Sequence, residues 1–175
     1  TVSEKATVSV ITTAKTKIED WTTSGLSGIK NKPQHILTSF RDPRKLWAFV
    51  LHQMAFKRRG GPNKQYSAPE GYVNTGSHFC IMLDGRIIQL HPMSRMIWHG
   101  NCVSPRSVAV EFEGNFPNIK GGWWIDRKST VQNKDIPTQA QYDAGRFLAS
   151  YLKVVLGTTH ILAHRQSSDS RENDP

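Results

Sequence analysis

The sequence predicts an α/β domain whose central mixed β-sheet is flanked by helices. Three observations predict it: short apolar runs recur through the middle of the chain, one later segment has helical periodicity, and another apolar run follows that segment. Strands that alternate with helices pack as layers around a shared core. A chain of 175 residues is long enough to bury such a core in one domain.

Four apolar runs in the first two thirds of the chain are predicted to be strands of this sheet. They are residues 46–51, 78–83, 86–90 and 107–113. Asp84-Gly85 separates the second run from the third and is a strong hairpin signal. Alternation in the fourth run places Val108 on one face of its strand and Glu111 and Glu113 on the other.

Residues 137–156 have the clearest helical pattern in the sequence. Apolar residues recur there at i, i+3 and i+4 spacing, Pro137-Thr138 supplies a start signal, and Gly157 supplies a stop. The apolar residues 160–163 then predict a last strand.

The N-terminal part of the chain, residues 1–45, is predicted to be an extension that precedes the main domain of residues 46–175. Within it, the β-branched residues of 8–11 indicate an edge strand. The Gly and Pro residues of 21–45 indicate a loop with a turn or two.

The composition limits the classes of partner. The formal net charge is +9 and the isoelectric point is near 9.8, so the surface favours anionic polymers. Basic and aromatic residues do not interleave at a regular spacing, so no nucleic-acid partner is predicted. No run approaches the roughly 18–20 apolar residues of a membrane span, so none is predicted. We expect a monomer and leave the location open.

The two cysteines are too few for a disulfide scaffold. Cys80 lies in an apolar run and is predicted to be a buried thiol. A bridge between Cys80 and Cys102 is the alternative.

Two histidines and one aspartate suggest a metal site. His52 ends an apolar run, His164 follows the apolar residues 161–163, and Asp174 closes the polar loop after His164. Three such ligands with a fourth position open to water are typical of a catalytic zinc site. A histidine at a strand end is more often structural than a ligand, so these residues alone leave both interpretations open.

Five segments also occur in an order that resembles a known family. They are residues 49–55, 77–90, 98–101, 107–114 and 164–175. In this order they resemble the zinc-dependent N-acetylmuramoyl-L-alanine amidases of the type-2 family, whose fold is shared by the peptidoglycan recognition proteins. The resemblance covers about residues 46–175 and leaves residues 1–45 uncovered.

The resemblance implies a function and a site. His52, His164 and Asp174 would bind one Zn²⁺ per domain, and Glu111 would be the catalytic carboxylate. Glu113 shares its strand face and is the alternative for that role. The implied substrate is bacterial peptidoglycan or muropeptides, cut at the amide between N-acetylmuramic acid and L-alanine.

Further residues are expected around the substrate. The resemblance places His99, Trp98 and Asn101 near the substrate cleft. The long loops 57–76 and 115–136 are expected to wall the groove. The remaining histidines are expected to be structural or at the surface; they are His35, His78, His91 and His160.

The chain departs from the family pattern near its end. Family members often carry a lysine two residues before the aspartate ligand to stabilise the oxyanion, and Glu172 stands there in this chain. Arg171 or His99 is expected to supply the positive charge instead, a contribution typically worth about 3–4 kcal/mol. The family also continues beyond the position of Pro175, which predicts a truncated catalytic domain or one domain of a longer protein.

Two other functions fit the same residues. The first is a binding module of the same fold that holds muropeptides without cutting them. The second is a zinc hydrolase that acts on a different amide or on a peptide bond.

Overall fold

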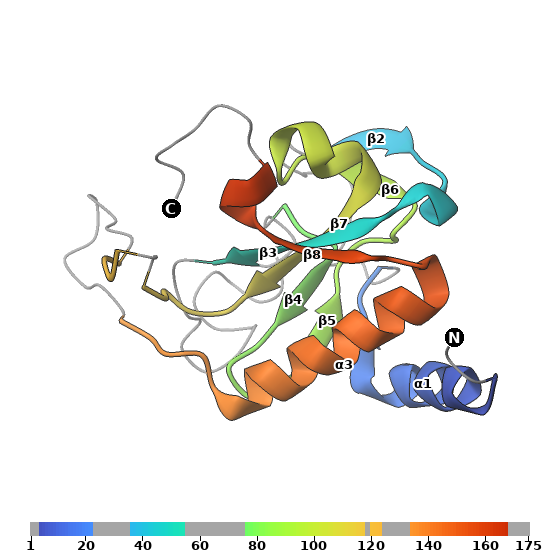
Figure 1. Cartoon of the computed structure of the whole chain (residues 1–175), viewed down its shortest axis with the longest axis horizontal. Helices are drawn as coiled ribbons and strands as arrows, with labels where there is room; N and C mark the ends of the chain where they lie inside the picture. Colours follow the sequence, from blue (N-terminus) through green and yellow to red (C-terminus); the bar gives the residue numbers. More distant parts are fainter. Residues whose placement is uncertain (1–3, 23–35, 55–75, 118–119, 124–133, 168–175) are drawn as a thin grey trace.

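The computed structural model describes residues 4–22, 36–54, 76–117, 120–123 and 134–167 (Figure 1). Within these ranges the α-helices are α1 (Glu4–Lys17) and α3 (Gln139–Leu156). Its eight strands are β1 (Ile18–Asp20), β2 (Ile36–Phe40), β3 (Ala48–Gln53), β4 (Phe79–Ile81), β5 (Ile87–Gln89), β6 (Arg95–Ile97), β7 (Ser107–Phe112) and β8 (His160–Ala163). Three 3-10 helices are η3 (Pro43–Lys45), η4 (Asn101–Arg106) and η5 (His164–Ser167).

Six of the strands form the central sheet, in the order β1-β5-β4-β7-β3-β8. Neighbouring strands are parallel except β4 and β5, which are antiparallel. The predicted mixed sheet with helices against it is therefore confirmed. Parallel strands place their carboxyl ends at the same edge, so residues that follow β3, β7 and β8 meet there.

The antiparallel pair β4–β5 is the hairpin predicted from Asp84-Gly85. The backbone N–H of Met82 donates to the carbonyl of Arg86 at 2.9 Å, and that of Gly85 donates to Met82 at 2.9 Å. Gly85 has a φ of 86°, and a Cβ atom there would lie 3.0 Å from Ala140 Cβ. The turn thus needs glycine both for its backbone conformation and for its close approach to α3.

The helix α3 begins and ends where its sequence signals predict. The Thr138 hydroxyl accepts a hydrogen bond from the Gln141 backbone N–H at 3.1 Å, and the Gln141 side chain accepts one from Thr138 at 3.1 Å. This reciprocal capping satisfies backbone donors at the start of the helix. Gly157 ends it in the left-handed conformation, with a φ of 72°.

The main core lies between α3 and the sheet (Figure 1). Ala144, Leu148 and Leu152 are spaced four residues apart on α3, so they share one helix face, and all three are buried. They belong to one cluster with apolar residues of the sheet, including Phe49 and Val110. A smaller cluster on the other face of the sheet includes residues of β4 and β5.

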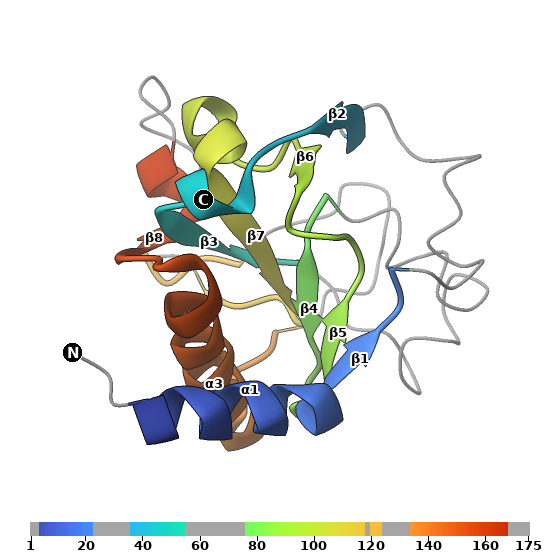
Figure 2. The same cartoon turned by 90° about the vertical axis from the view of Figure 1, so that its right-hand side faces the viewer.

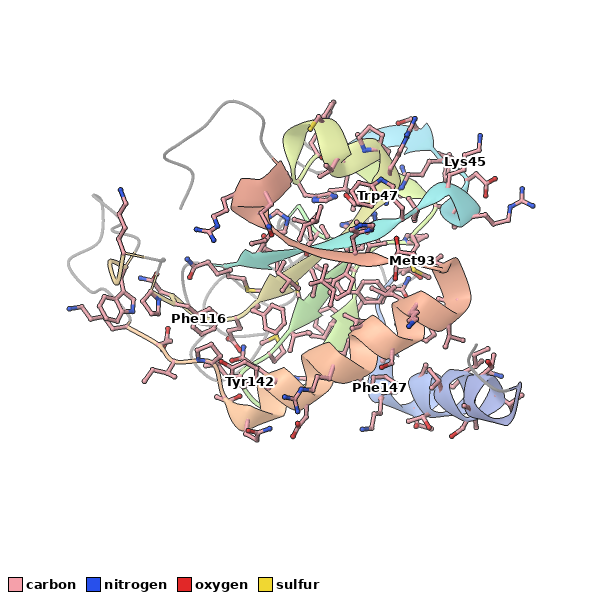
Figure 3. All side chains as sticks on the ribbon, in the orientation of Figure 1. Lys45, Trp47, Met93, Phe116, Tyr142 and Phe147 are labelled. Atoms are coloured by element: carbon pink, nitrogen blue, oxygen red, sulfur yellow. The ribbon has the colours of Figure 1, made fainter. Side chains whose placement is uncertain are left out.

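The N-terminal residues extend this architecture. Figure 2 shows α1 crossing α3 and leading into β1, which lies beside β5. The Lys17 ammonium group sits 5.1 Å from the ring centroid of Phe147, which extends from α3 toward α1 in Figure 3. Glu19 on β1 accepts two hydrogen bonds from the Arg86 guanidinium, at 2.6 and 2.7 Å. The domain boundary at residue 45 stays a prediction.

The strand predicted at residues 8–11 is wrong, because these residues lie inside α1. Thr7, Val10, Thr13 and Ala14 are the more buried of its described side chains, at helical spacing. Packing of this stripe against α3 outweighs the β preference of the β-branched residues. The loop predicted at 21–45 also contains β2, which pairs with β6 in a separate two-stranded sheet.

Two further expectations concern the state of the cysteines and membrane-spanning helices. Both cysteines are free thiols; Cys80 is buried, as predicted, and Cys102 is exposed. Among the residues described here, no helix combines the length and the apolar character that crossing a bilayer requires.

Candidate active site

Three predicted site residues lie in one row across parallel strands. His52 on β3 is the direct partner of Glu111 on β7. On the other side of β3, Leu51 pairs with Ala163 at the end of β8, so His164 is the next position in that register. The imidazole rings of His52 and His164 have centroids 4.4 Å apart. The sheet register itself therefore brings together side chains from distant parts of the sequence.

This row lies on the face of the sheet opposite α3. Phe49 and Leu51 pack in the core against α3, and side chains alternate along a strand, so His52 points to the other side. The same alternation on β7 sends Val110 to the α3 core and Glu111 to the opposite face. Strand alternation therefore separates the polar site from the main core.

One oxygen of the Glu111 carboxyl group is buried. Its Oε2 atom is buried and has no hydrogen-bond partner among the residues that the structure describes, although the residue as a whole is only half-buried. Burial disfavours the charged form and raises the pKa of Glu111 to about 8. Cys80 on β4 is its register partner on the other side and is buried. A buried carboxyl without a partner marks a place where a ligand or a proton is expected.

His99 reaches the row from outside the sheet. Its Nδ1 atom lies 3.2 Å from His52 Nε2, and its Nε2 atom lies 3.2 Å from the Ser107 hydroxyl. The Ser104 hydroxyl accepts hydrogen bonds from the backbone N–H groups of His99 at 3.1 Å and Gly100 at 2.9 Å. Burial is the main cause that lowers the pKa of His99 to about 3, and it also lowers that of His52 well below its ordinary value. Both rings are therefore neutral at pH 7.

The segment that carries His164 packs against the segment that carries His99. Helices η4 and η5 lie side by side in Figures 1 and 2. The Cys102 thiol donates to the carbonyl of Ser167 at 3.4 Å, and the Ser167 hydroxyl donates to that of His164 at 2.5 Å. A Cβ atom at Gly100 would lie 2.7 Å from Ser167 Oγ. A residue larger than glycine at position 100 would therefore have to displace the Ser167 side chain.

His78 is a structural residue, as the sequence analysis expected. It is fully buried, and its Nδ1 atom accepts a hydrogen bond from the Ala109 backbone N–H at 3.0 Å. Its Nε2 atom therefore carries the proton, which it donates to the Arg95 carbonyl at 2.9 Å, and the Nη2 atom of Arg41 also lies 2.9 Å from this nitrogen. Arg41 lies beside it and donates to the carbonyls of Met93 and Ser104. Burial lowers the pKa of Arg41 to about 10.

The other predicted residues lie outside this cluster or outside the described part of the chain. Trp98 follows β6 and is 46% exposed, as a substrate-contacting side chain would be. Asn101 opens η4. Glu113, the alternative carboxylate, accepts a hydrogen bond from the Leu83 backbone N–H at 3.0 Å and is 3% exposed, which gives it a structural role. Arg171 and Asp174 lie outside the described residues.

Three residues that shape the site were not singled out in the sequence analysis. Ser107 contacts His99 through its hydroxyl, Ser104 holds the backbone of the His99 segment, and Arg41 ties that region to neighbouring carbonyls. Ser107 had a sequence signal, because it lies on the same alternating face of its strand as Glu111. Nothing in the sequence marked Ser104 or Arg41.

The chemistry of these side chains fits a zinc ion. His52 and His164 bring two neutral imidazoles together, and Glu111 places a buried oxygen without a partner beside His52. Imidazole nitrogen and carboxylate oxygen are the donors that zinc prefers in hydrolases. Within the described ranges no group of three or more His, Cys, Asp or Glu side chains is arranged to hold a metal. The third expected ligand, Asp174, falls beyond those ranges.

Solved structures show the same fold at low sequence identity. An N-acetylmuramoyl-L-alanine amidase, LysC from Clostridium intestinale, is 19% identical with a TM-score of 0.57, covering 88% of this chain and 86% of its own. The bumblebee peptidoglycan recognition protein PGRP-SA is 14% identical with a TM-score of 0.59, covering 87% and 86%. A Drosophila PGRP-LB mutant in complex with tracheal cytotoxin is 17% identical with a TM-score of 0.53, covering 88% and 86%.

The family follows from the sequence of the domain itself. No curated protein matches the chain. The family described as N-acetylmuramoyl-L-alanine amidase, Amidase_2, matches residues 42–175, which include every strand of the row that holds Glu111, His52 and His164. The chain belongs to the N-acetylmuramoyl-L-alanine amidase family.

Proposed function

We propose that the chain is a zinc-dependent amidase that cuts peptidoglycan between N-acetylmuramic acid and the L-alanine of the stem peptide. The observation that carries this proposal is the row of Glu111, His52 and His164 at the carboxyl ends of three parallel strands. A member of this family with two adjacent imidazoles and a buried carboxyl beside them has the groups that hydrolysis of an amide needs.

The proposed metal ligands are His52, His164 and Asp174. Zinc, when bound, supplies Lewis acidity that activates water and polarises the scissile carbonyl. The imidazoles of His52 and His164 are held in register by β3 and β8, which keeps both donors in place before any ligand arrives.

Glu111 is the proposed proton carrier. Within the described part of the chain its Oε2 atom is buried without a partner, and the raised pKa of about 8 lets the group both hold and release a proton near neutral pH. The ionised form of this carboxyl accepts a proton from the attacking water, and the protonated form so produced gives that proton to the leaving amine. Of the two residues expected to supply positive charge to the oxyanion, Arg171 is proposed, because burial lowers the pKa of His99 to about 3 and leaves its ring neutral at pH 7.

The substrate is proposed to lie along the surface near Trp98 and Asn101. The exposed indole of Trp98 offers an apolar face of the kind on which sugar rings stack. The formal net charge of +9 attracts the anionic polymers of a bacterial envelope. Tracheal cytotoxin, bound to the PGRP-LB mutant with this fold, supports a peptidoglycan fragment as the ligand class.

The decisive experiment is digestion of purified peptidoglycan, followed by mass spectrometry of the products. We expect free L-alanine amino termini to appear in the digest. They should not appear when a chelator has removed metal from the protein, and they should appear again when zinc is added back. His52→Ala should abolish cleavage. His160→Ala is the matched control, because this exposed histidine belongs to β8 but not to the row, and it should cleave at the wild-type rate.

The same digest separates the alternatives. Products opened at a different bond would identify a different zinc hydrolase. Muropeptides retained by the protein without new amino termini would identify a binding module and contradict the proposed amidase.

A further inference from the structure

We propose that Ser107 is a positioning residue that fixes the tautomer of His99 and so aims its Nδ1 lone pair at His52. The side chains form a chain of hydrogen bonds that starts at a backbone carbonyl and ends at the row of the candidate active site. This inference rests on the proposed function only for its effect on cleavage; the tautomer itself is a property of the protein alone.

The first step concerns the proton of the Ser107 hydroxyl. A hydroxyl has one proton to donate. Ser107 Oγ lies 2.7 Å from the Val103 carbonyl, which can only accept, so the proton points there. Ser107 is fully buried at the start of β7, and its oxygen keeps lone pairs available for another donor.

The second step assigns the proton of His99. Its Nε2 atom lies 3.2 Å from Ser107 Oγ, whose single proton already takes part in the hydrogen bond to the Val103 carbonyl. Nε2 must therefore be the donor in this contact. A neutral imidazole carries one proton, so Nδ1 holds the lone pair.

The third step extends the assignment to His52. The Nδ1 atom of His99 lies 3.2 Å from His52 Nε2, so His52 donates its Nε2 proton to His99. The ring centroids are 5.3 Å apart, close to the 3.2 Å between the two nitrogens plus the two ring radii, so the nitrogens face each other although the ring planes are inclined at 82°. Nδ1 of His52 is then the nitrogen that holds a lone pair, on a ring whose neighbour is His164.

The scaffold around Ser107 makes this arrangement rigid. Ser107 is anchored in β7, where it pairs with Ala48 of β3, so its hydroxyl cannot follow a moving loop. Ser104 holds the backbone of His99 from the other side. Hydrogen bonds to the backbone of His99 and to its Nε2 atom leave the ring little freedom to flip. Outer hydrogen-bond partners of this kind orient groups that bind or react.

The tautomer is measured by two-bond proton–nitrogen NMR on the metal-free, nitrogen-15-labelled full chain at pH 7.5. The spectrum separates protonated from lone-pair nitrogens in each of the seven histidines. His99→Gln identifies the signals of His99 by their absence. In the wild type we expect a single Nε2–H form for His99. Nδ1–H, or a mixture of forms, overturns the proposal without any Ser107 variant.

Three variants test whether Ser107 is the cause. Ser107→Ala should release His99 into a mixture of tautomers, whereas Ser107→Thr keeps the hydroxyl and should keep the single form. Ser150→Ala removes an exposed helix serine and is the matched control. If the alanine variant does not fold, Ser107→Cys replaces it, since a thiol is a weak acceptor. A wild-type tautomer in the folded Ala or Cys variant contradicts the role of Ser107.

The effect on catalysis is read from the kinetics of peptidoglycan cleavage. Loss of such an outer partner typically costs about 10- to 100-fold, so Ser107→Ala should lower kcat by that factor and leave KM unchanged. Ser107→Thr should restore kcat. An altered KM with an unchanged kcat, or failure of threonine to restore the rate, overturns the positioning role. Absence of cleavage by the wild type would instead remove the proposed function and leave the NMR result standing.

Discussion

The two faces of the six-stranded sheet differ in what they bury. The face under α3 buries an apolar cluster that includes Phe79, Val110 and Leu148. The opposite face buries a smaller apolar cluster that includes residues of β4 and β5, and beside it His52 and the Oε2 atom of Glu111. Burying polar groups costs free energy, whereas burying apolar groups supplies it, so the first face stabilises the fold on which the second depends.

Residues that stabilise the fold and residues of the candidate site can be direct neighbours in the sequence. Val110 and Glu111 are neighbours in the chain, yet they lie on opposite faces of β7. A register shift of one residue would exchange them and place a carboxyl group in the main core. Substitution of the polar residues on the site face should therefore lower activity, whereas substitution of the apolar residues under α3 should lower stability.

The largest expected effect is on the polar face. Glu111→Gln keeps the shape of the side chain but removes its ability to carry a proton, so kcat for peptidoglycan cleavage should fall by about 10²- to 10⁴-fold. The free energy of unfolding should stay within about 1 kcal/mol of the wild type, because a neutral group replaces a carboxyl that burial already holds neutral. Initial rates and urea unfolding measure the two quantities.

Glu19→Gln is the control for that substitution, since Glu19 is a partly exposed carboxylate on β1, at the other end of the sheet. It should leave kcat unchanged. Equal activity of the two variants would remove Glu111 from the proposed chemistry.

The next effect belongs to the apolar face. Leu148 is fully buried in the cluster under α3, so Leu148→Ala should lower the free energy of unfolding by about 2–5 kcal/mol. The activity of the folded fraction should be unchanged. Val155→Ala on the same helix is the control, because Val155 is 36% exposed and its truncation should cost well under half as much. A folded Leu148→Ala protein with lost activity would show that the faces are not independent.

The smallest effect is a dependence of stability on pH. Burial holds the pKa of His78 well below 6.5 in the folded state, so the unfolded chain binds a proton below that pH and the folded chain does not. The stability contributed by neutral His78 is complete above pH 6.5 and is lost as pH falls through its folded pKa. The slope per group is about 1.4 kcal/mol per pH unit.

His78→Asn tests this slope, because an amide oxygen can accept the Ala109 N–H that the imidazole accepts. Urea unfolding of the metal-free proteins at pH 7, 6 and 5 should show that the free energy of unfolding falls less steeply with decreasing pH in the variant than in the wild type. Three other buried groups near it also titrate, namely His52, His99 and Glu111. They are present in both proteins, so their contributions cancel when the two pH profiles are subtracted. Parallel pH profiles would contradict a neutral buried His78.

The elements that the sequence predicted are those with local signals. Thr138 and Gly157 mark the ends of α3, and Asp84-Gly85 marks the β4–β5 turn, because caps and tight turns depend on a few adjacent residues. The strand predicted from residues 8–11 was wrong because the β preference of single residues is weak. These residues form a helix that packs on α3, and such tertiary contacts are not visible in a local pattern. β2 was missed because its pairing partner, β6, lies far along the chain.

The site divides in the same way. Strand ends drew attention to His52 and His164, and the family resemblance added Glu111 and His99. The register that places His52 between Glu111 and His164 needed the structure, since strand order is not encoded in any single segment. Ser107 shares a face with Glu111, but only coordinates reveal that its hydroxyl meets His99.

The position of β8 has a consequence for how the molecule loses activity on heating. It is the terminal strand of the six and carries exposed residues, so fraying at this border opens before the interior does. Each opening carries His164 away from His52 while α3 stays closed over β4 and β7. Inactivation by heat should thus precede the loss of helical circular dichroism, and a clamp across β3 and β8 would raise the working temperature without touching the core.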